Sequence, residues 1–134
     1  MSMWNWIVLA VLAALALLLW GWHLKRSWNR TRLNSSARKR VLEQWALVQS
    51  EGEPHRKLLG ADAVLDVALA GLGYQGTLGE KLKRAGSFVP DLNEVWRAHK
   101  IRNRIAHEAG IQLSEREVQE AIRVLEKTIH HFCR

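Results

Sequence analysis

The residues of this chain best suited to chemistry stand together in one short segment. Residues 99–108 read HKIRNRIAHE, in which Arg102 is followed directly by Asn103 and His107 lies five residues after Arg102. An imidazole titrates near neutral pH, which suits proton transfer. A guanidinium binds phosphate through a planar fork of N–H donors. Together these groups are suited to acid–base chemistry at a phosphate ester.

The spacing of Arg102 and His107 limits how one copy of the chain can use them. Each residue of an α-helix turns by about 100°, so five residues separate the two side chains by about 140° around the axis. They share no face unless the helix ends or bends before His107. A cleft that is built from two copies of the chain avoids this difficulty.

A structural role for the same segment is the alternative. His99, Arg102 and Asn103 share one face with Ala106, and such a face can form a polar seam between helices. Basic residues near the end of a helix are also favoured by its dipole, which would explain His107 without any catalysis.

The six residues RNRIAH, 102–107, resemble the signature of the HEPN superfamily: Arg, a polar residue, three further residues and His. The setting is similar too, because residues 37–134 predict a small all-α bundle with the motif late in one helix and a long helix after it. The resemblance implies a homodimer whose two motifs meet in one cleft and cleave RNA without metal or other cofactor. It implies His107 as general acid or base at the ribose 2′-hydroxyl, Arg102 at the scissile phosphate, and Asn103 as the group that orients either of them.

RNA contacts beyond the motif would come from a local basic cluster, namely Arg97, Lys100 and Arg104. Ala109 stands where one toxin branch of the superfamily has a tyrosine. Many HEPN-like domains are non-catalytic binding or dimerisation modules. The sequence therefore leaves three interpretations: an endoribonuclease, a module that recruits a protein partner, and an accessory subunit of a membrane complex.

Other chemistries lack their motifs. The chain has no phosphate loop, no HExxH and no G-x-S-x-G. Its one cysteine, Cys133, allows neither an internal disulfide nor a cysteine metal site, and suits a reducing compartment. Asp62 and Asp66 are four residues apart on a predicted helix, where a solvated face explains them. We expect no metal and no cofactor.

The elements that must position the motif are helices. Apolar residues recur at i+3 and i+4, and capping pairs open the later segments at Thr77, Asp91 and Ser114. No stretch alternates long enough to predict a strand. The expected fold is an up-and-down bundle of four or five helices, over about residues 37–50, 54–70, 77–86, 91–108 and from 114 onward.

An apolar segment precedes this bundle. Residues 4–24 read WNWIVLAVLAALALLLWGWHL, with tryptophans at both ends and no charge. Twenty-one helical residues span about 31 Å, close to the thickness of a bilayer's hydrocarbon core. A cleaved signal peptide would carry basic residues before the apolar run, and a core helix would be too apolar for so small a chain. We therefore expect a transmembrane anchor over residues 1–24.

The charge distribution predicts the orientation of this anchor. Residues 25–40 contain seven basic and no acidic residues, whereas residues 41–134 contain 13 of each. The positive-inside rule places the N-terminus outside and the domain in the cytoplasm. Residues 25–36 form a basic linker, unless the membrane helix continues through it. Expected contacts with membrane lipid are Lys25, Arg26, Trp28, Arg30 and Arg32. Because residues 41–134 have no net charge, they give no separate support for broad RNA affinity.

Overall fold

The computed structural model describes residues 3–28 and 31–134, without the side chains of residues 24–28. The described residues form helices and loops and contain no strand, which confirms the all-α prediction. The helices are α1 (Met3–Trp28), α2 (Ser35–Gln49), α3 (Pro54–Gly71), α4 (Leu78–Ala85), the short 3-10 helix η1 (Gly86–Phe88), α5 (Leu92–His107) and α6 (Glu115–Phe132).

Helix α1 is long and apolar enough to cross a membrane. Its 21 residues from Met3 to His23 have a mean hydropathy of 2.1, and none of the window is buried in the protein. The helix continues to Trp28, so residues 25–28 of the expected linker are helical. Arg30 and the side chains of Lys25, Arg26 and Trp28 lie outside the described residues.

Helix α1 does not run into the first helix of the domain. Residues 31–34 are not helical, and Asn34 caps α2 by accepting a hydrogen bond from the backbone N–H of Ala37 at 2.8 Å. The chain accordingly divides into two compact units, residues 1–31 and 32–134. The second unit contains the RNRIAH segment.

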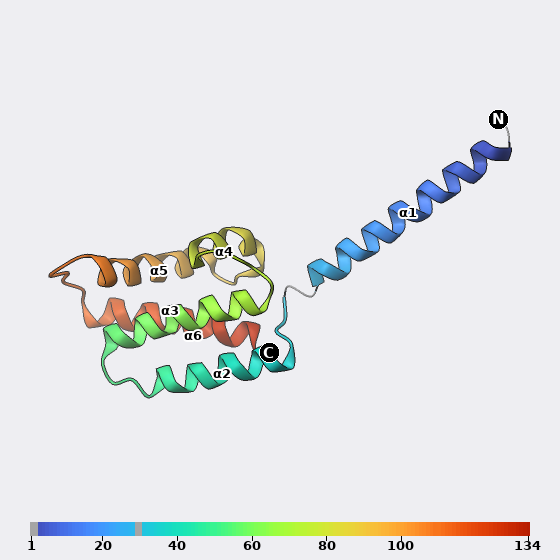
Figure 1. Cartoon of the computed structure of the whole chain (residues 1–134). Coiled ribbons are helices and arrows are strands. Elements are labelled where there is room, and N and C mark those ends of the chain that lie inside the picture. Colours follow the sequence, from blue (N-terminus) through green and yellow to red (C-terminus); the bar gives the residue numbers. More distant parts are fainter. Residues whose placement is uncertain (1–2, 29–30) are drawn as a thin grey trace. The chain divides into compact units, whose positions relative to one another are not determined.

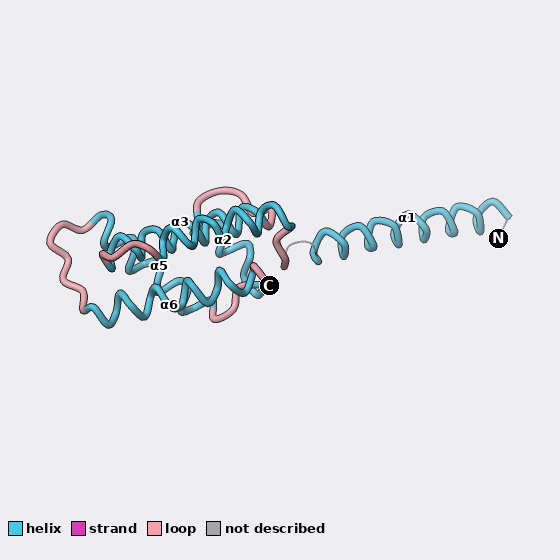
Figure 2. The backbone as a smooth tube through the Cα atoms, turned by 90° about the horizontal axis from the view of Figure 1, so that it is seen from below, coloured by secondary structure: helices cyan, strands magenta, loops and turns pink. Residues whose placement is uncertain are grey.

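Helix α3 lies at the centre of the second unit. It packs against α2, α4, α5 and α6, while α5 packs along α6 (Figures 1 and 2). The long helices alternate in direction along the chain, as the predicted up-and-down bundle requires. The fully buried side chains at its core include Leu58, Leu65, Leu69, Leu82, Leu125, Ile129 and Phe132.

The chain joins the bundle at the end where α3 and α6 finish. The Leu33 N–H donates to the Phe132 carbonyl at 3.4 Å. A Cβ at Gly71 would come within 2.8 Å of Leu33 Cδ2, so glycine at the end of α3 leaves room for this side chain. His107 lies at the opposite end, beside the loop that leads into α6.

Three helices begin with a carboxylate bound to backbone N–H groups, and this predicts an acid-sensitive fold. Hydrogen bonds from the helix starts lower the pKa of Glu53, Glu80 and Glu117. A lowered folded-state pKa stabilises the fold above the unfolded value, near 4.3, and the stabilisation is lost as the pH falls through the folded value. The free energy of unfolding should therefore decrease on acidification below about pH 5.

Urea denaturation at a series of pH values measures this effect. Glu117→Gln should flatten the acid limb of the profile, because the neutral amide does not titrate. Glu115→Gln, two residues earlier in α6 and outside the capping box, is the matched control and should leave the limb unchanged. A wild-type profile that stays flat down to pH 3 would contradict the prediction.

Candidate functional site

A polar cluster joins α3 to α5 at the start of the RNRIAH segment. Asp62 of α3 is 4% exposed, which is rare for a carboxylate without a partner. Its Oδ1 lies 2.9 Å from His99 Nδ1, and its Oδ2 lies 3.1 Å from Arg102 Nε. The Arg102 Nε–H makes no hydrogen bond, so this second contact is an ion pair whose N–H is poorly aimed.

Asn103 closes the cluster into a ring of four side chains. Its Nδ2 lies 3.3 Å from His99 Nε2, and Arg102 Nη1 donates to its Oδ1 at 3.0 Å. We call Asp62, His99, Asn103 and Arg102 the polar ring. Each member contacts two others, so the buried carboxylate and the imidazole are both compensated.

One tautomer of His99 fits the contacts of the ring. A neutral imidazole with its proton on Nδ1 donates to Asp62 and accepts from the Asn103 amide. The Asn103 oxygen is then free to accept from Arg102.

A second ion pair, in which only the lysine is buried, lies beside the polar ring. Lys81 of α4 is 5% exposed, and its Nζ donates to Asp66 Oδ1 at 2.9 Å. Asp62 and Asp66 thus tie α5 and α4 to the same face of α3. The expectation that these two carboxylates form a solvated face is wrong for Asp62, which is buried, whereas the Asp66 side chain is 38% exposed. Asp62 lies in a mostly apolar helix, and basic residues follow on later helices. This combination was the signal in the sequence that the carboxylate could be buried and paired.

An open pocket of about 510 Å³ lies over the ring. It is lined by His99, Arg102 and Asn103 of α5, by Asp62 and Asp66 of α3, and by residues 76–79 at the start of α4. The Arg102 side chain is 31% exposed, so part of its guanidinium faces this pocket. The predicted Arg102 and Asn103 therefore lie together at an accessible surface, although both are engaged in the ring.

His107 lies apart from the ring. Helix α5 continues to His107 as its last residue, so no bend brings this side chain to the face of Arg102. His107 is exposed and does not line the pocket. The structure thus places Arg102 with Asn103 and separates them from His107 within one copy. His99 and Asp62 belong to this site but were not among the catalytic or RNA-binding residues predicted from the sequence.

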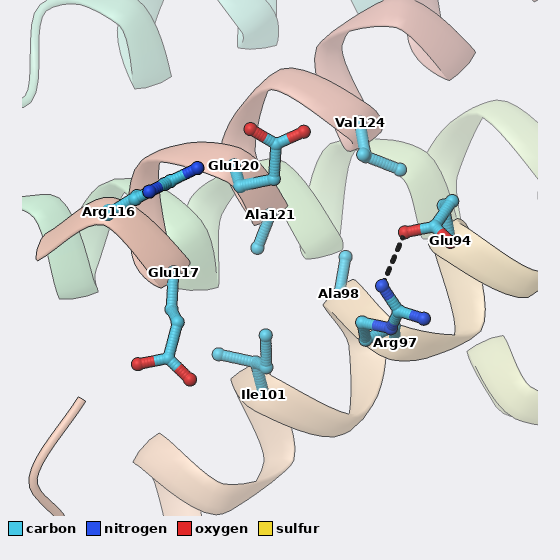
Figure 3. Close-up of a pocket in the computed structure, with 9 residues that line it drawn as sticks. All are labelled: Glu94, Arg97, Ala98, Ile101, Arg116, Glu117, Glu120, Ala121 and Val124. Carbon is cyan, nitrogen blue, oxygen red and sulfur yellow. Dashed lines mark hydrogen bonds and ion pairs between the residues drawn. The ribbon is translucent and has the colours of Figure 1, made fainter. Parts of the chain in front are cut away.

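The three predicted RNA contacts beyond the motif lie on one stripe of α5, at i, i+3 and i+7, but two of them are paired with carboxylates. Arg97 pairs with Glu94 at 3.0 Å and lines a different pocket, of about 320 Å³, between α5 and α6 (Figure 3). Arg104 pairs with Glu108 at 3.3 Å, and Lys100 is exposed. The floor of the second pocket is apolar and is formed by Ala98, Ile101, Ala121 and Val124.

No group of three or more His, Cys, Asp or Glu residues in the described part of the chain is arranged to hold a metal ion. No family model, no curated protein and no solved structure matches this chain.

Proposed function

We propose that the protein is a membrane-anchored, HEPN-like endoribonuclease that works as a homodimer without a metal. The proposal rests on RNRIAH in an all-helical domain, where Arg102 opens into a pocket and His107 is exposed at the helix end. Arg102 would bind the scissile phosphate and stabilise its developing charge. His107 would exchange a proton with the ribose 2′-hydroxyl.

Two copies are needed because one straight helix separates these groups. Five residues of α5 place His107 about 7.5 Å further along the axis than Arg102 and about 140° around it. One phosphodiester cannot meet both groups from the same copy. In a dimer with a twofold axis near the end of α5, His107 of each copy would face Arg102 of the other.

The polar ring would prepare Arg102 for this role. Asp62 forms an ion pair with the Nε side of the guanidinium and Asn103 accepts from Nη1, and these two contacts restrict the position of the group. A fixed guanidinium loses less conformational freedom when phosphate binds. Asn103 would thus act on Arg102 and His99 through the ring rather than on RNA alone.

The test uses the full chain, purified in detergent and incubated with a fluorescently labelled RNA. The proposal expects cleavage that persists in EDTA and leaves a 2′,3′-cyclic phosphate or 3′-phosphate end, because the 2′-hydroxyl is the attacking group. If the RNA stays intact both with and without EDTA, the endoribonuclease proposal is wrong and the second candidate remains.

The second candidate is a non-catalytic, membrane-tethered interaction module. The observation that favours it is that the polar ring is complete within one copy, with each of its four members already partnered. On this reading Arg102 and Asn103 stabilise the α3–α5 contact, and the exposed surface binds a protein partner or a larger membrane complex. RNA cleavage separates the two candidates.

We also propose that the helical domain lies in the cytoplasm and the N-terminus outside it. The reason is that basic residues in the linker favour the cytoplasmic side of a membrane. A green fluorescent protein fused after Arg134 should therefore fluoresce, and an alkaline phosphatase fused there should be inactive. Replacing Lys25, Arg26, Arg30 and Arg32 by glutamine should weaken this preference. An active phosphatase fusion in the wild-type chain would contradict the orientation.

A further inference from the structure

The outer face of α2 combines positive charge with apolar surface. Arg38, Lys39 and Arg40 occupy its first two turns and are all exposed. Within the described part of the chain, Lys39 of this triplet pairs with Glu43 at 3.9 Å, and both side chains are exposed. Such an exposed pair contributes little, so the face keeps most of its positive charge.

A shallow groove runs along the same face. Leu42 and Ala46 form its apolar floor, and Arg38 and Lys39 lie at its edge together with Ser35 and Glu43. An apolar strip with basic residues beside it is the arrangement by which a helix lies in a membrane interface, its cations on anionic headgroups. Residues 41–134 have no net charge, so this charge is local to the part of the domain that follows the anchor.

A short segment joins the apolar window of α1 to the folded unit. Five helical residues, 24–28, and three more, 29–31, separate the apolar window from the folded unit. They reach at most about 18 Å. Leu33 is fixed against Phe132 and Gly71, so the tether cannot lengthen by unravelling the start of the domain without breaking these contacts.

We propose that the outer face of α2 docks on the anionic lipid surface next to the anchor. Leu42 and Ala46 then lie at the boundary between headgroups and acyl chains, and Arg38 and Lys39 beside them contact phosphate groups. Helix α5 lies across α3 from α2 (Figure 1), so docking leaves the polar ring and His107 away from the membrane. This inference goes beyond the proposed nuclease and does not depend on it.

Fluorescence quenching of the full chain in nanodiscs tests the proposal. A dye on Ala46→Cys, in a Cys133→Ala background, reports the groove, and a dye on Glu120→Cys reports α6. The probe membranes are phosphatidylcholine alone and an equal mixture with phosphatidylglycerol, each with a headgroup nitroxide lipid. We expect stronger quenching at position 46 in the anionic discs, its loss in high salt, and little quenching at position 120.

The charge-matched variants decide the outcome. Neutralising the α2 triplet should abolish the difference between the two membranes at position 46, whereas neutralising three basic residues elsewhere should keep it. The two variants are Arg38→Gln/Lys39→Gln/Arg40→Gln and Arg97→Gln/Arg104→Gln/Arg123→Gln. Equal quenching in both membranes would overturn the proposal. So would a triplet variant that unfolds at lower temperature but keeps the wild-type quenching, since the triplet would then serve only the fold.

Discussion

His107→Ala is expected to lower the rate of RNA cleavage by at least about 100-fold, the usual contribution of a general acid or base. The substitution removes the one exposed imidazole of the motif and leaves the polar ring untouched, because His107 lines neither the ring nor its pocket. The rate is measured with the full chain in detergent under single-turnover conditions. Stability should change by less than about 0.5 kcal/mol, as is usual for surface substitutions.

The matched control is His131→Ala on α6, another exposed histidine near a helix end. It should cleave RNA at the wild-type rate. If His107→Ala and His131→Ala are equally active, His107 takes no part in the chemistry. If both are inactive in a folded protein, RNA binding rather than proton transfer explains the loss.

Asp62→Ala is expected to destabilise the domain by about 3 kcal/mol, at the lower end of the range for removing one member of a buried ion pair. The substitution leaves Arg102 and His99 facing each other near the α3–α5 contact without the carboxylate that compensates them. The partial exposure of Arg102, at 31%, lets water replace some of the lost interaction and limits the effect. Urea denaturation of the full chain in detergent, followed by near-ultraviolet circular dichroism, measures it.

Glu120→Ala controls for the loss of a carboxylate as such. Glu120 pairs with Arg123 at 2.6 Å on the surface of α6, and both side chains are more than 60% exposed. Removing it should cost less than about 1 kcal/mol. Equal losses for Asp62→Ala and Glu120→Ala would mean that the polar ring contributes no more to stability than a surface pair.

Much of this fold could be predicted from the sequence because its signals are local. Periodic apolar residues located the helices, and the pairs Thr77/Glu80 and Ser114/Glu117 form capping boxes at the predicted starts. The pair at Asp91 was only partly right. A helix begins there, but Asp91 adopts a left-handed conformation with a φ of 49° and makes no side-chain cap. Its carboxylate instead accepts from Lys127 at 2.6 Å.

The polar ring could be predicted only in part, because it depends on a contact between distant residues. The spacing on α5 correctly placed His99, Arg102 and Asn103 on one face. Nothing local indicated that this face meets Asp62, which lies 37 residues before His99. The burial of Asp62 follows from the packing of α3 against α5, and helix periodicity does not encode which helices pack together.

The separation of Arg102 from His107 makes one experiment decisive for the shared site. Arg102→Gln and His107→Ala are purified separately as full chains and then mixed under conditions where differently tagged subunits exchange. A mixed dimer keeps one intact pair, the Arg102 of one copy with the His107 of the other. Random mixing should therefore restore about a quarter of the wild-type cleavage rate, although each variant alone is inactive. A mixture that exchanges subunits and stays as inactive as its components would contradict a site formed by two copies.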